Sequence, residues 1–314
     1  MNKKLIALAV AGALAAPLSA QAVDVSTYGS LGWKLVDADN ASWEMKPTKT
    51  RLGWNASEAT DYGKFTGQIE FDFDNDVNNG GSSNEIDTRR ARIIWGTKGA
   101  GTFVLASRTP SGSYADMHSM VDIFSHGGYH YYTQGDHAGK LIAWKSPTSG
   151  GIYFSAALVA SAPGTTVGTD SEDIDVTVWR AVWNSGPWHA AYGQVINNNT
   201  TNSDDTRDAL GVSWKNNGLM VGFSWEDAIS SSATLDGDTT TGVAVSYTAG
   251  NNTFKAAVYS RDSDITPAND GDGATTLEIA HAFSKNVTGF VTIDSVETGG
   301  VSADSTAFGM NMSF

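Results

Sequence analysis

Hydrophobic and polar residues alternate along most of this chain, and segments with a helical period are hard to find. In residues 65–73, for example, every odd-numbered position is apolar or glycine and every even-numbered position is polar. Successive side chains of a β-strand point to opposite faces, so this alternation predicts strands with one apolar face and one polar face.

Similar stripes recur at intervals, and each stripe predicts one strand. In chain order they are Val25, Thr27, Gly29, Leu31, Trp33 and Leu35; Leu52, Trp54 and Ala56; the odd positions of 65–73; Ile93 and Trp95; Phe103 and Leu105; Ile142 and Trp144; Thr177, Trp179, Ala181 and Trp183; Leu210, Val212 and Trp214; Leu219, Val221, Phe223 and Trp225; Val243, Val245 and Tyr247; Phe254, Ala256 and Val258; and Leu277, Ile279 and Phe283.

The last ten residues carry the most informative stripe. Phe308, Met310, Met312 and Phe314 fall on one face of an extended strand, and the residues between them are small or polar. A water-soluble protein rarely ends on such an exposed apolar face. The pattern is typical of a transmembrane β-barrel strand, which meets lipid on one face and water on the other.

The connections between stripes alternate in length, as expected of an outer-membrane barrel with tight turns at one end and long loops at the other. The short ones cover 58–63, 97–101, 146–151, 184–187, 215–218, 249–252 and 284–286; the long ones cover 37–46, 75–86, 109–136, 161–173, 196–207, 227–238, 262–272 and 297–303. Together they predict an all-β, antiparallel transmembrane barrel of about 16 strands. The alternative is a secreted β-sandwich, which also alternates but would bury one face of each sheet.

The N-terminus has the features of a secretory signal peptide. A short basic stretch with Lys3 and Lys4 precedes an apolar run that is too short to span a bilayer comfortably, and Ala20-Gln21-Ala22 fits the A-x-A cleavage pattern. We expect residues 1–22 to be removed and 23–314 to form a single barrel domain. The alternative, a membrane anchor, is less consistent with the cleavage pattern.

Composition excludes some functions and agrees with an exported barrel. The formal charge of −14 becomes −16 when Lys3 and Lys4 are removed, because no acid leaves with them; this argues against nucleic-acid binding, which needs a basic surface. Trp and Tyr occur ten times each, and both favour membrane–water interfaces. There are no cysteines, and a barrel closed by its own hydrogen bonds has little need of disulfides.

Several segments resemble the Gram-negative general porins. They are residues 50–71 and 90–108, the turn segments at 146–151 and 184–188, and the terminal Phe314. The resemblance covers essentially the whole mature chain. It implies a homotrimer of 16-stranded barrels in the outer membrane, in contact with lipid and lipopolysaccharide. It also implies that the third long loop, here about 109–136, folds into the lumen, where its acids face basic residues of the wall.

Four arginines are candidates for the wall of this constriction. Arg51 lies opposite in parity to Leu52 and Trp54, and Arg90 and Arg92 lie opposite to Ile93 and Trp95, so they are expected to point inward; Arg108 ends the next strand on its polar face. Across a narrow gap from carboxylates, guanidinium groups create a transverse field that orients dipolar solutes. The alternative is that they fill space or pair with Glu70 and Asp72 of the same wall.

On the loop side the candidates are Asp116, Asp122 and His126, of which Asp122 resembles the acidic loop position of the family. Four of the six histidines fall in this region: His118, His126, His130 and His137. They could form a metal site or a pH-sensitive gate, because histidine titrates near neutrality, or they could simply line the pore.

A second long loop, residues 74–85, approximates a calcium-binding pattern. Asp74, Asp76, Asn78 and Glu85 occupy ligand positions, but the glycine comes one place late, so metal binding here is a weak candidate. The family resemblance offers a different role, a loop that latches neighbouring subunits together.

These observations favour a porin for passive diffusion of small hydrophilic solutes and ions, with modest cation preference from the acidic loops and lumen. A porin selective for one solute class is an alternative. A barrel hydrolase is less favoured: outside the third loop only His189 and His281 are available, and neither lies in a catalytic motif. We therefore expect no enzymatic activity and no cofactor.

Overall fold

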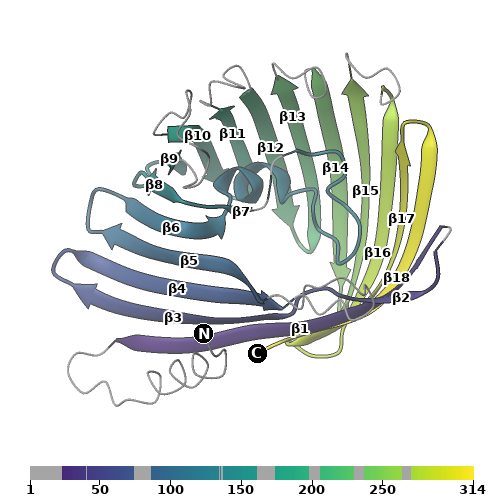
Figure 1. Ribbon diagram of the computed structural model, residues 1–314, viewed down its shortest axis with the longest axis horizontal. Helices are drawn as coiled ribbons and strands as arrows, with labels where there is room; N and C mark the ends of the chain where they lie inside the picture. The colour runs from purple at the N-terminus through teal and green to yellow at the C-terminus, as the bar shows by residue number, and fades with distance from the viewer. Residues whose placement is uncertain are drawn as a thin grey trace, which may run out of the picture.

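A computed structural model describes residues 23–39, 41–73, 86–133, 135, 137–160, 174–197, 206–229, 237–263 and 270–314. Within these ranges the chain forms one closed, antiparallel, 16-stranded β-barrel, which confirms the predicted fold class (Figure 1). No helix in this part of the protein is long and apolar enough to cross a membrane.

Sixteen strands run in chain order around the barrel. They are β1 (Asp24–Ala38), β3 (Arg51–Thr60), β4 (Gly63–Phe73), β5 (Ile86–Thr97), β6 (Thr102–Pro110), β8 (Leu141–Lys145), β9 (Ile152–Ala160), β10 (Ile174–Ser185), β11 (Trp188–Asn197), β12 (Thr206–Asn216), β13 (Leu219–Ile229), β14 (Asp238–Ala249), β15 (Asn252–Ser263), β16 (Asp272–Ala282), β17 (Val287–Thr298) and β18 (Val301–Ser313).

Two short strands extend interrupted barrel strands. β2 (Glu44–Pro47) pairs with the C-terminal half of β1, whereas β3 pairs with its N-terminal half. Together β2 and β3 therefore form one wall strand that is broken at residues 48–50. Likewise β7 (His137–Ala138) and β8 both pair with β6.

The barrel closes between its first and last strands. β1 and β18 pair over a register from Ser30 opposite Ser313 to Ala38 opposite Ser305. Phe314 continues this seam, because its backbone N–H and C=O both bond Gly29 at 3.0 Å. Figure 1 shows the C-terminal end of the chain, after β18, lying beside β1.

The two faces of the wall differ in the sense that the alternation predicts. The outward apolar side chains are exposed: Leu31, Ile93 and Met310 have exposed fractions between 50% and 53%. Inward polar side chains such as Thr276 and Thr292 are fully buried. This distribution is the reverse of that in a soluble sandwich and matches a barrel with a polar interior.

The seven predicted tight turns are confirmed, but one predicted long loop is wrong. β17 ends at Thr298 and β18 begins at Val301, so the segment expected to loop out over 297–303 is a two-residue turn. Gly299 and Gly300 have φ of 59° and 74°, the left-handed conformations that a tight type I′ hairpin needs at both central positions. The polar flanking residues belong to the strands.

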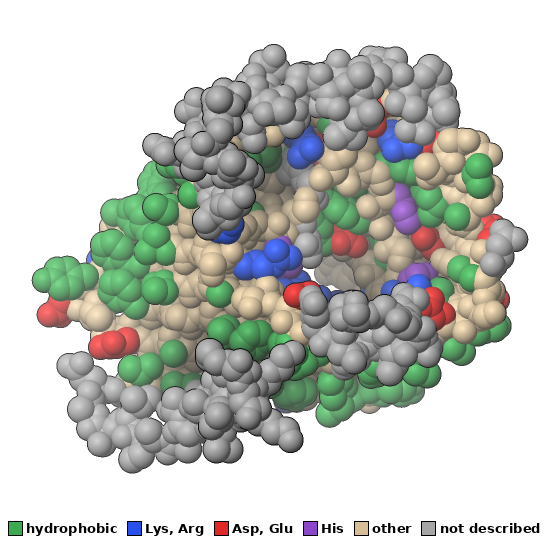
Figure 2. Space-filling model, viewed as in Figure 1, with side chains coloured by type: hydrophobic (Ala, Val, Ile, Leu, Met, Phe, Trp, Pro, Cys, Tyr) green, Lys and Arg blue, Asp and Glu red, His purple; other side chains and the backbone are tan. Residues whose placement is uncertain are grey.

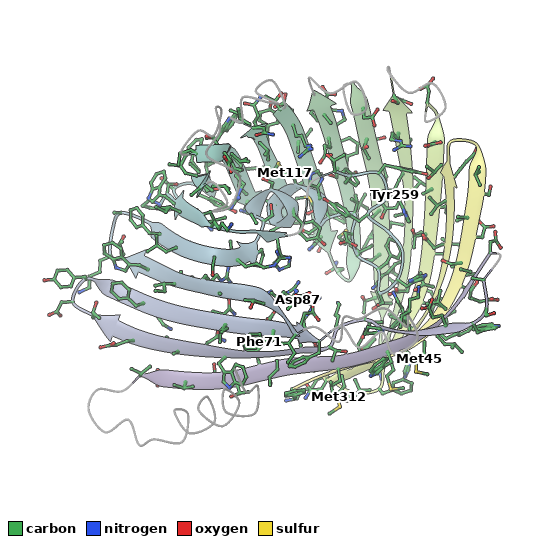
Figure 3. All side chains as sticks on the ribbon, in the orientation of Figure 1. Met45, Phe71, Asp87, Met117, Tyr259 and Met312 are labelled. Carbon is green, nitrogen blue, oxygen red and sulfur yellow. The ribbon has the colours of Figure 1, made fainter. Side chains whose placement is uncertain are left out.

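The third loop folds into the lumen, as predicted. After β6 it forms a short π-helical turn, η1 (Tyr114–His118), which contacts β11, β12 and β13. Figure 3 shows Met117 of this turn and Tyr259 of β15 inside the barrel and Met312 of β18 on its outer side. The loop therefore narrows the lumen along one part of the wall.

Candidate functional site: the constriction of the lumen

An irregularity in β5 brings an additional arginine to the inner wall. Glu70 of β4 is paired with Arg90 and the next residue, Phe71, with Thr88, so Arg89 is a bulge residue. Arg89 Nη1 lies 2.7 Å and Arg90 Nε 3.4 Å from the same Oε1 of buried Glu70. Because a bulge breaks strict alternation, Arg89 and Arg90 both reach the polar face.

Arg51 also meets a carboxylate of its own wall. Arg51 Nε lies 3.3 Å from Asp72 Oδ2, and Arg89 Nε lies 3.7 Å from the same oxygen. Arg51, Arg89, Asp72 and Arg108 line one hollow of about 380 Å³. The structure thus places the predicted Arg51 and Arg108 together and adds Arg89.

Arg92 connects the wall to the start of the third loop. Its Nε donates to Gln68 Oε1 at 2.7 Å and its Nη1 to Thr109 Oγ1 at 2.8 Å. Gln68 in turn donates to the Tyr28 hydroxyl at 2.8 Å. Arg92 is therefore held inward, as its parity predicts, by neutral partners.

Asp116 is held by strands other than those that carry Arg51, Arg90 and Arg92. Its Oδ2 lies 2.6 Å from Arg180 Nε of β10, and its Oδ1 accepts a 3.1 Å hydrogen bond from the Tyr153 hydroxyl of β9. Its backbone carbonyl also bonds His189 Nε2 at 2.9 Å. Asp116 thus anchors the loop to a basic residue that the sequence interpretation did not select.

Asp122 interacts electrostatically with a different basic residue, Lys49. It also accepts a hydrogen bond from the Tyr114 hydroxyl. Lys49 occupies the break between β2 and β3, where it also interacts with Arg51 and, with opposite sign, with Glu278. The break therefore contributes a cation that faces a predicted loop acid.

His126 bonds the first and last strands of the barrel. Its Nδ1 lies 2.9 Å from Lys34 Nζ of β1, and its Nε2 lies 3.0 Å from Ser305 Oγ of β18. Burial and the nearby charge of Lys34 lower the pKa of His126 to about 4. This side chain is therefore neutral at neutral pH.

Two other loop histidines attach to inward acids of the wall. His118 is fully buried; its Nδ1 lies 2.8 Å from Ser224 Oγ and its Nε2 3.2 Å from Glu226 Oε2. His130 Nε2 lies 2.9 Å from Asp294 Oδ1. Among residues placed by the structure, no three His, Asp or Glu side chains form a group able to hold a metal. The calcium-like residues Asp74, Asp76, Asn78 and Glu85 lie outside the described residues.

Glu278 of β16 is a further anchor. Its Oε2 accepts a 2.6 Å hydrogen bond from the backbone N–H of Ser125, and its Oε1 lies 2.6 Å from Lys255 Nζ. Lys255 Nζ also donates a 2.6 Å hydrogen bond to the Ile123 carbonyl. Glu278 lies between the outward residues Leu277 and Ile279, so parity could have identified it. Its loop partner could not be identified in that way.

The opening of the barrel is charged and its outside is apolar. Figure 2 shows basic, acidic and histidine side chains around the central hollow and hydrophobic side chains on the outer surface. A water-filled lumen allows such charges to remain ionised without the cost of burial in lipid. The fold and this site define a channel-forming protein of the outer membrane.

Comparison with known proteins gives the family. The Gram-negative porin family matches residues 7–300, so the chain belongs to this family. No curated protein matches the chain.

Solved structures share the fold at low sequence identity. An anion-selective porin from Comamonas acidovorans is 15% identical with a TM-score of 0.75, covering 93% of this chain and 100% of that chain. A Salmonella typhi OmpF complex with daunomycin is 14% identical with a TM-score of 0.75, covering 92% and 97%. A loop L8 deletion mutant of OmpT, an outer membrane protein of Vibrio cholerae, is 14% identical with a TM-score of 0.72, covering 94% and 100%.

Proposed function

We propose that this porin is a general diffusion channel for small hydrophilic solutes and ions. The main support is a closed barrel whose polar lumen is narrowed by an internal loop. The wall of the passage carries Arg51, Arg90, Arg92 and Arg108. The third loop carries Asp116, Asp122 and His126, which lie on the other side of the passage or anchor the loop to the wall. The salt-bridged wall acids reduce the positive field of the arginines.

We further propose a modest cation preference. The negative formal charge, −14 for the full sequence and −16 without Lys3 and Lys4, supports it, as does the pairing of Arg51 and Arg90 with wall carboxylates. Reversal potentials across a planar bilayer under a KCl gradient test the proposal. Neutralising Arg51 and Arg92 together should increase the cation preference, whereas clear chloride preference in the wild type would contradict it.

A solute-selective porin is the nearest alternative. Liposome swelling with sugars, amino acids and organic anions of matched size distinguishes the two. A general pore should rank solutes by size, and a selective pore should admit one chemical class faster than its size predicts.

We also propose that the protein is not a hydrolase. Ser224, His118 and Glu226 do meet, but their side chains are at most 1% exposed, and the serine lies on the Nδ1 side of the ring. A substrate could not reach this hydroxyl while the loop is docked. Hydrolysis of a lipid or peptide panel that is abolished by S224A would contradict this proposal.

The assembly and processing proposals follow the family. We propose a homotrimer embedded in outer-membrane lipid and lipopolysaccharide, and cleavage after Ala22. One of the similar structures is described as a trimer form of an outer membrane protein from Vibrio cholerae. Cross-linking of unheated membranes and N-terminal sequencing of the exported protein test these proposals separately.

A further inference from the structure

A row of polar side chains crosses four neighbouring strands on the lumen face, beside the constriction. Thr102 of β6 is opposite Lys145 of β8, Lys145 is opposite Ser155 of β9, and Ser155 is opposite Arg180 of β10. Directly opposite residues of an antiparallel pair have Cβ atoms about 4.5–5.5 Å apart, so two cations flank Ser155.

The hydroxyl at the centre of this row is buried but has no hydrogen-bond partner among the described residues. Ser155 is 7% exposed. A buried hydroxyl normally has a partner, because leaving one unpaired costs about 1–3 kcal/mol. Its position between Lys145 and Arg180 suits an anionic acceptor.

The next row along the same strands is apolar. Val104, Ala143, Ala157 and Val178 are paired in register across β6, β8, β9 and β10. Both rows line one cavity of about 210 Å³, which the base of the third loop encloses at Ser111 and Gly112. The cavity has a polar row beside an apolar row.

The charge in this cavity is positive. Arg92, Lys145 and Arg180 line it, and no Asp or Glu is among its described lining residues. Asp116 neutralises Arg180 from outside the lining at 2.6 Å, whereas Lys145 Nζ lies 3.7 Å from the centre of the Tyr153 ring. Lys145 is therefore the cation best able to receive a ligand charge.

We propose that this cavity is a binding subsite for small organic monocarboxylates with a compact apolar body. The carboxylate lies at Lys145 and Ser155, with Arg180 beyond, and the apolar body packs on the Val104–Ala143–Ala157–Val178 row. A volume of about 210 Å³ is below the usual range for drug-sized ligands, so a single ring or short alkyl chain is the expected size. The inference rests on the proposed channel function, because the ligand enters through the lumen.

Benzoate is a suitable probe, with benzyl alcohol and acetate as controls that lack the charge or the ring. Titration calorimetry on the purified protein in micelles measures each affinity, and single-channel current in KCl measures block by benzoate. The K145Q variant should weaken benzoate binding by about tenfold or more. S155A should weaken it by a smaller factor.

K215Q is the matched control, because Lys215 of β12 lines a different hollow. This variant should bind benzoate like the wild type. Because benzoate also dissolves in the micelles, the comparison of K145Q with K215Q removes that contribution. Equal benzoate affinity in K145Q and K215Q, or benzyl alcohol binding as tightly as benzoate, would overturn the subsite. Normal KCl conductance without benzoate binding would overturn it too, whereas absent KCl conductance would contradict the proposed channel itself.

Discussion

Two glycines on the inner wall allow the third loop to lie directly against the barrel. A Cβ atom on Gly211 of β12 would lie 2.4 Å from the Met117 carbonyl oxygen, and one on Gly222 of β13 would lie 2.3 Å from the Met120 carbonyl oxygen. The obstructing atoms belong to the loop backbone, so a side-chain rotation cannot relieve the clash. At these positions the absence of a side chain determines how far the loop protrudes into the pore.

The G211A substitution should displace the loop. Overpacking of this kind typically costs about 1–3 kcal/mol, and the displaced loop should alter single-channel conductance. The measurements are the free energy of unfolding in urea and the conductance in KCl. G96A is the matched control, because Gly96 is also on the inner face but its nearest neighbour would be 3.8 Å from an added Cβ. Indistinguishable behaviour of the two variants would contradict the packing argument.

His126 should make loop docking sensitive to acid. Its pKa falls from an ordinary 6.5 to about 4 in the folded protein, so the unfolded chain binds a proton more readily between these values. The stabilising contribution is therefore complete above pH 6.5 and is lost as the pH falls to about 4. Allowing for screening by lumen water, we expect on the order of 1–2 kcal/mol.

The measurement is urea unfolding of the wild type and H126Q, repeated between pH 7 and pH 4. H126Q should lose less stability on acidification, because glutamine does not titrate. H281Q serves for comparison, since His281 bonds Asn252 at the end of β16 rather than the loop. If wild type and H126Q weaken in parallel, the shifted titration of His126 is wrong.

At the scale of elements, the third loop is held by charged side chains of strands that are distant in sequence. Glu278 and Lys255 form an ion pair that contacts the loop backbone at Ser125 and Ile123. The Glu278 side chain is 0% exposed. Removing one member of a buried pair leaves the other uncompensated.

The E278Q substitution should therefore cost about 3–5 kcal/mol and increase current fluctuations, because the loop loses its anchor at Ser125. The K255M/E278Q double variant should lose less than the sum of the single losses, which a double-mutant cycle of unfolding free energies measures. E44Q is the control: Glu44 pairs with Lys46 at 2.7 Å on a more exposed site and should change stability by less than about 1 kcal/mol. Strict additivity of E278Q and K255M would show that the pair is not coupled.

Most strands were predictable because lipid and lumen impose opposite preferences on alternate residues. β9, β11 and β17 carry no predicted stripe. In β9 and β17 the inner face also bears large nonpolar rings, Tyr153 and Phe290, which blur the alternation. Parity placed Arg51 and Arg92, but Arg89 depends on a bulge that no local pattern indicates. The Asp116–Arg180 pair was not predictable either, because the position of the loop depends on contacts with strands far along the chain.

For the whole molecule, integrity depends on the seam between β1 and β18. Without β18 both β17 and β1 would have unpaired backbone groups in lipid, where no water can satisfy them. A chain lacking residues 301–314 should therefore not form the compact, heat-modifiable species seen by electrophoresis of folded barrels. Replacing Gly299-Gly300 by Asn-Gly, a pair that suits the same turn, is the control and should fold normally. A compact, heat-modifiable truncated chain would contradict the role of the seam.

The seating of the third loop has a consequence for the order of folding. His126 and Ser305 are separated by 179 residues, and Ser125 and Glu278 by 153, so the loop is made long before its anchors. Contacts of such long range form late, because the intervening chain must first be ordered. A refolding molecule should thus pass through a wide-bore stage, and its permeability should fall only when the final strands are in place.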